Sequence, residues 1–168
     1  MGVTDVERSI YDGLRALPWL QYLSTMCVLC EMLRNQYRDR LGETEQPLMT
    51  ETIRIAEETA ESGRPDDHHE IAATLRQQWA ALIDDDWNVT PGHWNTWCTY
   101  DAIAGEIVGN AKHYSGTERL LLAITDPWRE PYPGKARRIN PDELADDASP
   151  MAQALAAFNR VVIEARHA

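Results

Sequence analysis

The stretch PWLQYLSTMCVLCEMLRNQYRDRL, residues 18–41, sets the fold class of this chain. Apolar and aromatic residues recur along it at intervals of three and four, from Trp19 through Leu33 to Tyr37. That spacing is typical of an α-helix with a wide buried side. Three arginines near its end complement the helix dipole, and Gly42 supplies a stop. We therefore expect a long, central helix over about residues 18–41.

The same 3.6-residue pattern recurs along the rest of the chain, in segments separated by glycine and proline. Helices are predicted over about residues 4–17, 47–62, 66–83, 90–110 and 117–124, and a last one, broken near Pro150, reaches residue 163. Residues 126–141 hold four prolines and a glycine and are expected to form an extended loop. Because β-branched residues do not alternate, strands are not expected. The sequence predicts an all-α, single-domain helical bundle of about six to eight helices over residues 1–168.

The charge of the chain is strongly uneven. Its 168 residues carry a net charge of −11. Residues 111–141 hold six Lys and Arg against three Asp and Glu, which leaves −14 for the remainder. An acidic surface of this kind repels nucleic acid and anionic lipid, and it steers basic partners toward itself. We expect a basic protein partner, with neither nucleic acid nor membrane as a target.

The three cysteines and the N-terminal sequence bear on location. Cys27, Cys30 and Cys98 are an odd number for a disulfide scaffold, and the first two fall inside the strongest helical pattern. We expect buried, reduced thiols there. The N-terminus lacks a basic segment followed by an apolar core, and the stretch Leu17–Leu33 is too polar for a membrane span. Cytoplasmic location is the resulting expectation.

Catalytic signatures are missing from the sequence. It contains no Gly-x-Ser-x-Gly nucleophile motif and no glycine-rich phosphate loop, and its five histidines show no grouping. The adjacent pair His68–His69 points in diverging directions on a helix, so it cannot act as the i, i+4 pair of a zinc helix. We assign no catalytic residue and no cofactor, and an enzyme is not the favoured interpretation.

One alternative does involve metal chemistry. The pattern Glu57-Glu58-x-x-Glu61 superficially resembles the first metal-binding half of the all-α nucleotide pyrophosphatases. The resemblance implies a metal-dependent hydrolase, with Glu57, Glu58, Glu61 and Glu70 around Mg²⁺ or Mn²⁺ between two helices. That family also carries a second acidic pair, Glu-x-x-Asp, on its next helix. Here the next helix offers only Glu70 and the run Asp84–Asp86, at different spacing.

The favoured site combines acids with an aromatic anchor. Asp84–Asp86 lie at the C-terminal end of a predicted helix, where the dipole disfavours anions, and Trp87 follows them directly. Tryptophan often anchors protein interfaces, and acids beside it suit a partner that presents Arg and Lys. Trp94 and Trp97 are instead expected in the core. The predicted partner-binding residues are Asp84, Asp85, Asp86, Trp87, Asp66 and Asp67.

Two resemblances add to this interpretation. The stretch from Leu17 to Tyr37, with its leading Trp19 and its Cys30-Glu31 pair, resembles the N-terminal helices of a group of uncharacterised bacterial helical proteins. The whole profile resembles the small acidic immunity proteins that neutralise bacterial toxins. This second resemblance implies a protein that binds a basic partner and blocks it sterically. A further alternative is a structural subunit that self-associates through residues 126–141.

Overall fold

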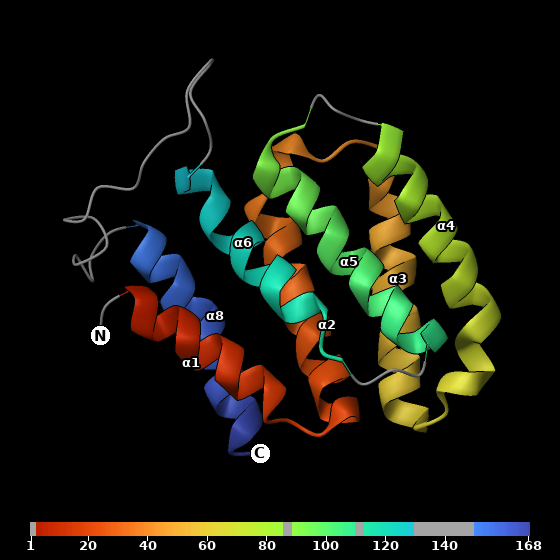
Figure 1. Cartoon of the computed structure of the whole chain (residues 1–168), viewed down its shortest axis with the longest axis horizontal. Coiled ribbons are helices and arrows are strands. Elements are labelled where there is room, and N and C mark those ends of the chain that lie inside the picture. Colours follow the sequence, from red (N-terminus) through yellow and green to blue (C-terminus); the bar gives the residue numbers. More distant parts are fainter. Residues whose placement is uncertain (1–2, 86–88, 110–112, 130–149) are drawn as a thin grey trace.

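The computed structural model describes residues 3–85, 89–109, 113–129 and 150–168. Within these ranges the chain forms seven α-helices and two short 3-10 helices, and no residue lies in a β-strand (Figure 1). The predicted all-α bundle is therefore confirmed. None of the described helices is both long enough and apolar enough to cross a membrane.

The helix boundaries follow the glycines and prolines of the sequence. Helix α2 begins directly after Pro18, α3 ends at Gly63, and α5 and α8 begin with Pro91 and Pro150. In chain order the elements are α1 (Val3–Arg15), α2 (Trp19–Gln36), η1 (Arg38–Arg40), α3 (Glu45–Ser62), η2 (Pro65–His68), α4 (His69–Asp85), α5 (Pro91–Gly109), α6 (Gly116–Arg129) and α8 (Pro150–Arg166).

The helices pack in neighbouring pairs around α2 and α5. Helix α5 lies between α4 and α6, α2 packs along α3, and α1 pairs with α8 (Figure 1). Short connections between consecutive helices favour the α2–α3, α4–α5 and α5–α6 pairs. The α1–α8 pair instead joins helices from opposite ends of the chain. The predicted stripe of α2, from Trp19 to Leu33, is buried throughout, and so is Tyr37 just beyond the helix. Helix α2 therefore holds the central place that the sequence predicts.

Aromatic residues with polar tips fill much of the core. The largest fully buried side chains include Trp79, Trp97, Tyr22, Tyr37 and Tyr100. Buried tyrosine and tryptophan usually need a hydrogen-bond partner. The Tyr100 hydroxyl donates to the Cys30 carbonyl at 2.9 Å, for example. A chain with six Trp, six Tyr and one Phe thus builds a core without many phenylalanines.

Two predicted boundaries were wrong. Helix α2 ends at Gln36 rather than near Leu41, because Tyr37 leaves helical geometry and a 3-10 turn follows it. Helix α6 continues to Arg129 instead of stopping near residue 124, so residues 126–129 are helical and not part of an extended loop. Asp126 is buried there and accepts a hydrogen bond from the Asn95 amide at 2.8 Å, which holds the last turn of α6 against α5. The rest of the predicted loop lies outside the described residues.

Candidate functional site

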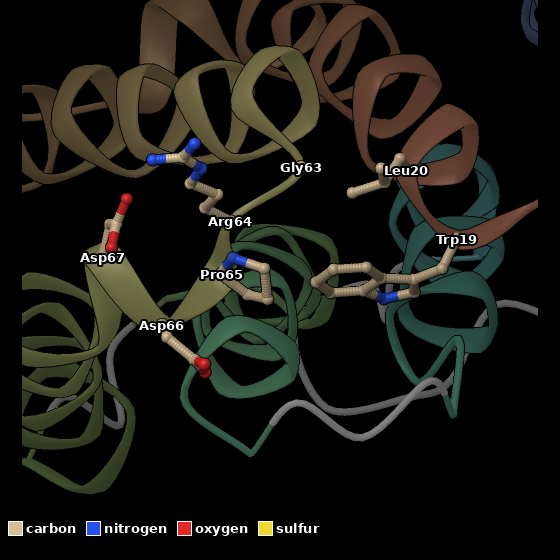
Figure 2. Close-up of a pocket in the computed structure, with 7 residues that line it drawn as sticks. All are labelled: Trp19, Leu20, Gly63, Arg64, Pro65, Asp66 and Asp67. Atoms are coloured by element: carbon tan, nitrogen blue, oxygen red, sulfur yellow. The ribbon is translucent and has the colours of Figure 1, made fainter.

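Two of the six predicted partner-binding residues line one pocket. Asp66 and Asp67 belong to η2, which faces the start of α2 across a hollow of about 470 Å³ (Figure 2). From α2, Trp19 contributes its indole and Leu20 its side chain. The full lining consists of Trp19, Leu20, Gly63, Arg64, Pro65, Asp66 and Asp67. The pocket therefore has an apolar side from α2 and a charged side from η2.

The sequence between α3 and α4 makes this hollow. Gly63 ends α3 with φ +67° and donates its N–H to the Thr59 carbonyl, a left-handed helix end that glycine adopts most easily. Pro65 then starts η2, since a proline fits the first position of a helix. A Cβ added at Gly63 would lie 3.5 Å from Leu20 Cδ1, which is ordinary contact. Glycine is thus favoured at position 63 by backbone geometry and not by space.

The charged groups of the pocket point in two directions. The carboxylate of Asp66 lies on the same side of η2 as the Trp19 indole, whereas Arg64 and Asp67 point away from that indole (Figure 2). Asp66 Oδ1 is 3.4 Å from His69 Nε2, a contact that lacks hydrogen-bond geometry. Among the described residues, Asp67 forms no ion pair. Both aspartates are exposed, so they are available to a cationic partner.

Asp84, the described side chain of the predicted acidic run, does not line this pocket. Asp84 is exposed near the C-terminal end of α4, while Asp66 and Asp67 precede its N-terminal end. Helix α4 has 17 residues, so at a rise of ~1.5 Å per residue Asp84 lies roughly 25 Å from Asp66 and Asp67. Of the predicted acids that the structure describes, Asp84 therefore lies apart from Asp66 and Asp67. The side chain of Asp85, and Asp86 and Trp87 entirely, lie outside the described residues.

The two tryptophans that were expected in the core differ in depth. Trp97 is fully buried, as predicted. Trp94 is half-buried: its indole N–H donates to the Ile83 carbonyl at 3.3 Å, and the Arg119 guanidinium lies over its ring. Neither residue lines the pocket at η2.

The four glutamates of the metal alternative are not arranged as a ligand set. Glu58 accepts a hydrogen bond from Arg54 at 2.7 Å and lies 3.9 Å from His68. Within the described residues, no group of three or more His, Cys, Asp or Glu side chains is placed so that it could hold a metal ion. Glu57, Glu61 and Glu70 are exposed. The geometry thus gives the hydrolase interpretation no support from these residues.

The cysteines are placed as structural thiols. Cys27 and Cys30 are buried in α2, and Cys98 is half-buried in α5. Burial raises the pKa of Cys27 to about 12 and that of Cys98 to about 11, and it raises the pKa of Cys30 well above its usual value. Because the thiolate is the reactive form, these surroundings make all three poor nucleophiles.

Besides Asp126, two buried carboxylates were not predicted from the sequence. Glu45 meets His93 with 2.8 Å between Oε1 and Nε2, and the same oxygen accepts the Gly42 N–H at 2.9 Å. Glu106 is buried in α5 and accepts the Ser115 N–H at 2.7 Å. The available signal was an isolated glutamate between apolar residues at helical spacing. Such a glutamate is indistinguishable in sequence from one on a solvated face.

Comparisons with known proteins add nothing to this geometry: no protein family, no curated protein and no solved structure matches the chain significantly.

Proposed function

We propose that this chain is a non-catalytic binding protein that binds a basic protein and blocks it, as an immunity protein or an antitoxin-like inhibitor does. The partner would be occluded sterically. Carboxylates would steer it, and apolar side chains beside them would supply the contact. This is the function that the chain's charge and exposed groups support best.

The observation that carries the proposal is a set of exposed carboxylates that form no ion pair within the described residues. Glu57 and Glu61 on α3 and Asp67 on η2 are exposed, and within the described residues none of them forms an ion pair. The neighbouring Glu51 differs, because Arg54 binds it and lowers the pKa of its carboxyl group. Unpaired carboxylates on a chain of net charge −11 raise the rate at which a basic protein arrives.

Affinity capture tests this proposal. The chain is immobilised, exposed to lysate of its native cell at low salt, and the retained proteins are identified by mass spectrometry. We expect one basic protein, retained in stoichiometric amount and weakened by high salt, since exposed charges are screened. Two double variants are compared. The first combines Glu57→Gln with Glu61→Gln on α3. The control combines Glu118→Gln with Glu164→Gln and removes the same charge from other helices.

The outcomes separate the proposal from its rivals. Slower association of the captured protein with the first double variant alone would support it. Equal retention of many unrelated proteins by both variants, or no retained basic protein, would overturn it. A mass that rises with protein concentration would instead favour the self-associating subunit.

A further inference from the structure

Helix α2 exposes a stripe that the predicted core leaves out. Leu20, Ser24, Val28 and Glu31 follow one another at helical spacing, and all four are exposed. Val28 is 50% exposed and Leu20 36%, although most apolar residues of α2 are buried. Val28 is also the most exposed of the large apolar side chains in the described ranges. The stripe therefore places two exposed apolar side chains, Leu20 and Val28, on the outer side of a central helix.

Helix α3 runs antiparallel to α2 beside this stripe. Gly63 lies against Leu20, Cys27 Sγ is 3.8 Å from the Ile53 carbonyl oxygen, and Arg34 donates to Gln46 at 2.7 Å. The start of one helix thus pairs with the end of the other. This antiparallel pairing determines which residues of α3 lie beside the stripe.

Two unpaired carboxylates therefore border the stripe. Glu57 and Glu61 of α3 lie between the levels of Cys27 and Leu20, and both are exposed. The charges of Glu57 and Glu31 add to burial in raising the pKa of Cys27, so both carboxylates lie near that residue. The outer stripe of α2 thus has acids beside it on α3 and at its own C-terminal end.

A pocket lies at each end of the surface that α2 and α3 form here, which we call the α2–α3 face. At the Leu20 end lies the pocket of η2, and at the other end lies a second pocket of about 720 Å³. The second one is lined by Arg34, Leu41, Gly42, Glu43, Gln46, Pro47, Thr50 and Glu51. From Leu20 to Arg34 the face extends for roughly 21 Å, the length of a four-turn helix.

We infer that this α2–α3 face binds a basic amphipathic helix of the partner, with apolar side chains on Leu20 and Val28 and with Lys or Arg beside Glu57 and Glu61. The inference rests on the proposed function and adds the place and the chemistry of contact. Helices that dock on such faces bury apolar side chains at i, i+3, i+4 and i+7. The flanking carboxylates repel a second copy of this acidic chain and attract a cationic helix.

The test uses two model peptides. One is an 18-residue amphipathic helix of Leu and Lys with a fluorescent label, and the other has every Leu replaced by Ala at the same charge. We expect the Leu peptide to bind at least tenfold more tightly. Val28→Lys should weaken its binding at least tenfold, whereas the matched Leu122→Lys, on α6, should change it less than twofold.

Three outcomes would overturn the inference. Equal binding of the two peptides, weakened by salt, would leave the acidic-binder function standing but remove the apolar docking face. Equal effects of Val28→Lys and Leu122→Lys would do the same. A protein dimer that Val28→Lys dissociates would assign the face to a second copy of the chain.

Discussion

The hydroxyl of Tyr37 donates to the carbonyl oxygen of Ala123 at 2.6 Å. That oxygen would normally accept the N–H of residue 127 in α6, but residue 127 is Pro127, which has none. A proline inside a helix thus leaves one acceptor open, and a buried tyrosine from beyond the end of α2 occupies it. The Gln36 side chain donates to the neighbouring Ile124 carbonyl at 3.0 Å. The Tyr37 and Gln36 side chains at the end of α2 therefore hydrogen-bond to the part of α6 that precedes Pro127.

Removal of the Tyr37 hydroxyl should destabilise the fold. Tyr37→Phe removes the closer donor of the Ala123 carbonyl and leaves it the Gln36 amide at 3.4 Å, which should cost about 1 kcal/mol of unfolding free energy. Pro127→Ala restores a backbone N–H at that position, so the same tyrosine change should cost less in its presence. Urea unfolding of the two single variants and the double variant measures this coupling. Equal costs of Tyr37→Phe in both backgrounds would show that Pro127 does not open the acceptor.

The same tyrosine sets a steric limit on α5. A Cβ added at Gly92 would lie 2.0 Å from Tyr37 Oη and 2.8 Å from its Cζ, closer than atoms can approach. Gly92→Ala must therefore displace a buried ring, and we expect a loss of about 2–4 kcal/mol. Gly42→Ala is the matched control, because an added Cβ there meets nothing within 4 Å. Thermal unfolding of the two variants compares them, and equal midpoints would refute the steric argument.

A second buried hydrogen bond ties α3 to α4. The indole N–H of Trp79 donates to Thr52 Oγ1 at 3.0 Å, and both residues are buried. Thr52→Val keeps the shape of the side chain but leaves the indole N–H unpaired, so we expect a cost of about 1–3 kcal/mol. Thr74→Val, an exposed threonine on α4, serves as the control. Similar unfolding free energies for the two variants would contradict the importance of this bond.

The thiols should be slow to react in the folded chain. The pKa of Cys98 is raised to about 11, chiefly by burial, so its thiolate fraction at pH 8 is roughly 100-fold below that of an ordinary cysteine. Iodoacetamide labelling followed by mass spectrometry should show slow modification of Cys27, Cys30 and Cys98 until urea unfolds the protein. Fast labelling of any of them in the native state would show that its surroundings are not as described.

Helical periodicity predicted the features that depend only on residues close together in the sequence, such as the buried side of each helix. The stripe from Trp19 to Tyr37 is buried as expected, because a 3.6-residue repeat places those side chains on one side wherever the helix lies. Leu20 and Val28 fall outside that stripe and are exposed. Which acids border them depends on the antiparallel pairing of α2 with α3, so the place of Glu57 and Glu61 beside Leu20 and Val28 could not be predicted from the sequence.

The burial of Glu106 could not be predicted from the sequence either. Its partner Ser115 follows Tyr114, whose backbone has φ +55°, and this turn folds the chain back onto α5. The distance between Asp84 and the pair Asp66 and Asp67 is also a matter of the fold, because it is set by the helix between them. Helix α4 has 17 residues, so these predicted partner-binding residues lie roughly 25 Å apart along it.

The buried carboxyl group of Glu106 should make stability depend on pH. Burial raises its pKa to about 7, although the backbone N–H of Ser115 partly stabilises the ionised form. The hydroxyl of Tyr22 lies beside it, and burial, together with the nearby carboxylate, raises the pKa of Tyr22. In the unfolded chain the pKa of glutamate is about 4.3. The folded protein therefore binds a proton more tightly than the unfolded one.

The higher pKa of Glu106 in the folded state determines how stability changes with pH. The stabilisation from protonated Glu106 is fully present below pH of about 4 and is lost as the pH rises to about 7. We expect its contribution to the unfolding free energy to fall by about 3 kcal/mol between pH 4 and pH 8. Glu106→Gln keeps an acceptor for Ser115 but cannot ionise, so urea unfolding of this variant should show a flatter pH dependence over that range. Parallel pH profiles for the two proteins would mean that Glu106 does not carry the titration, because every other ionisable group is common to both.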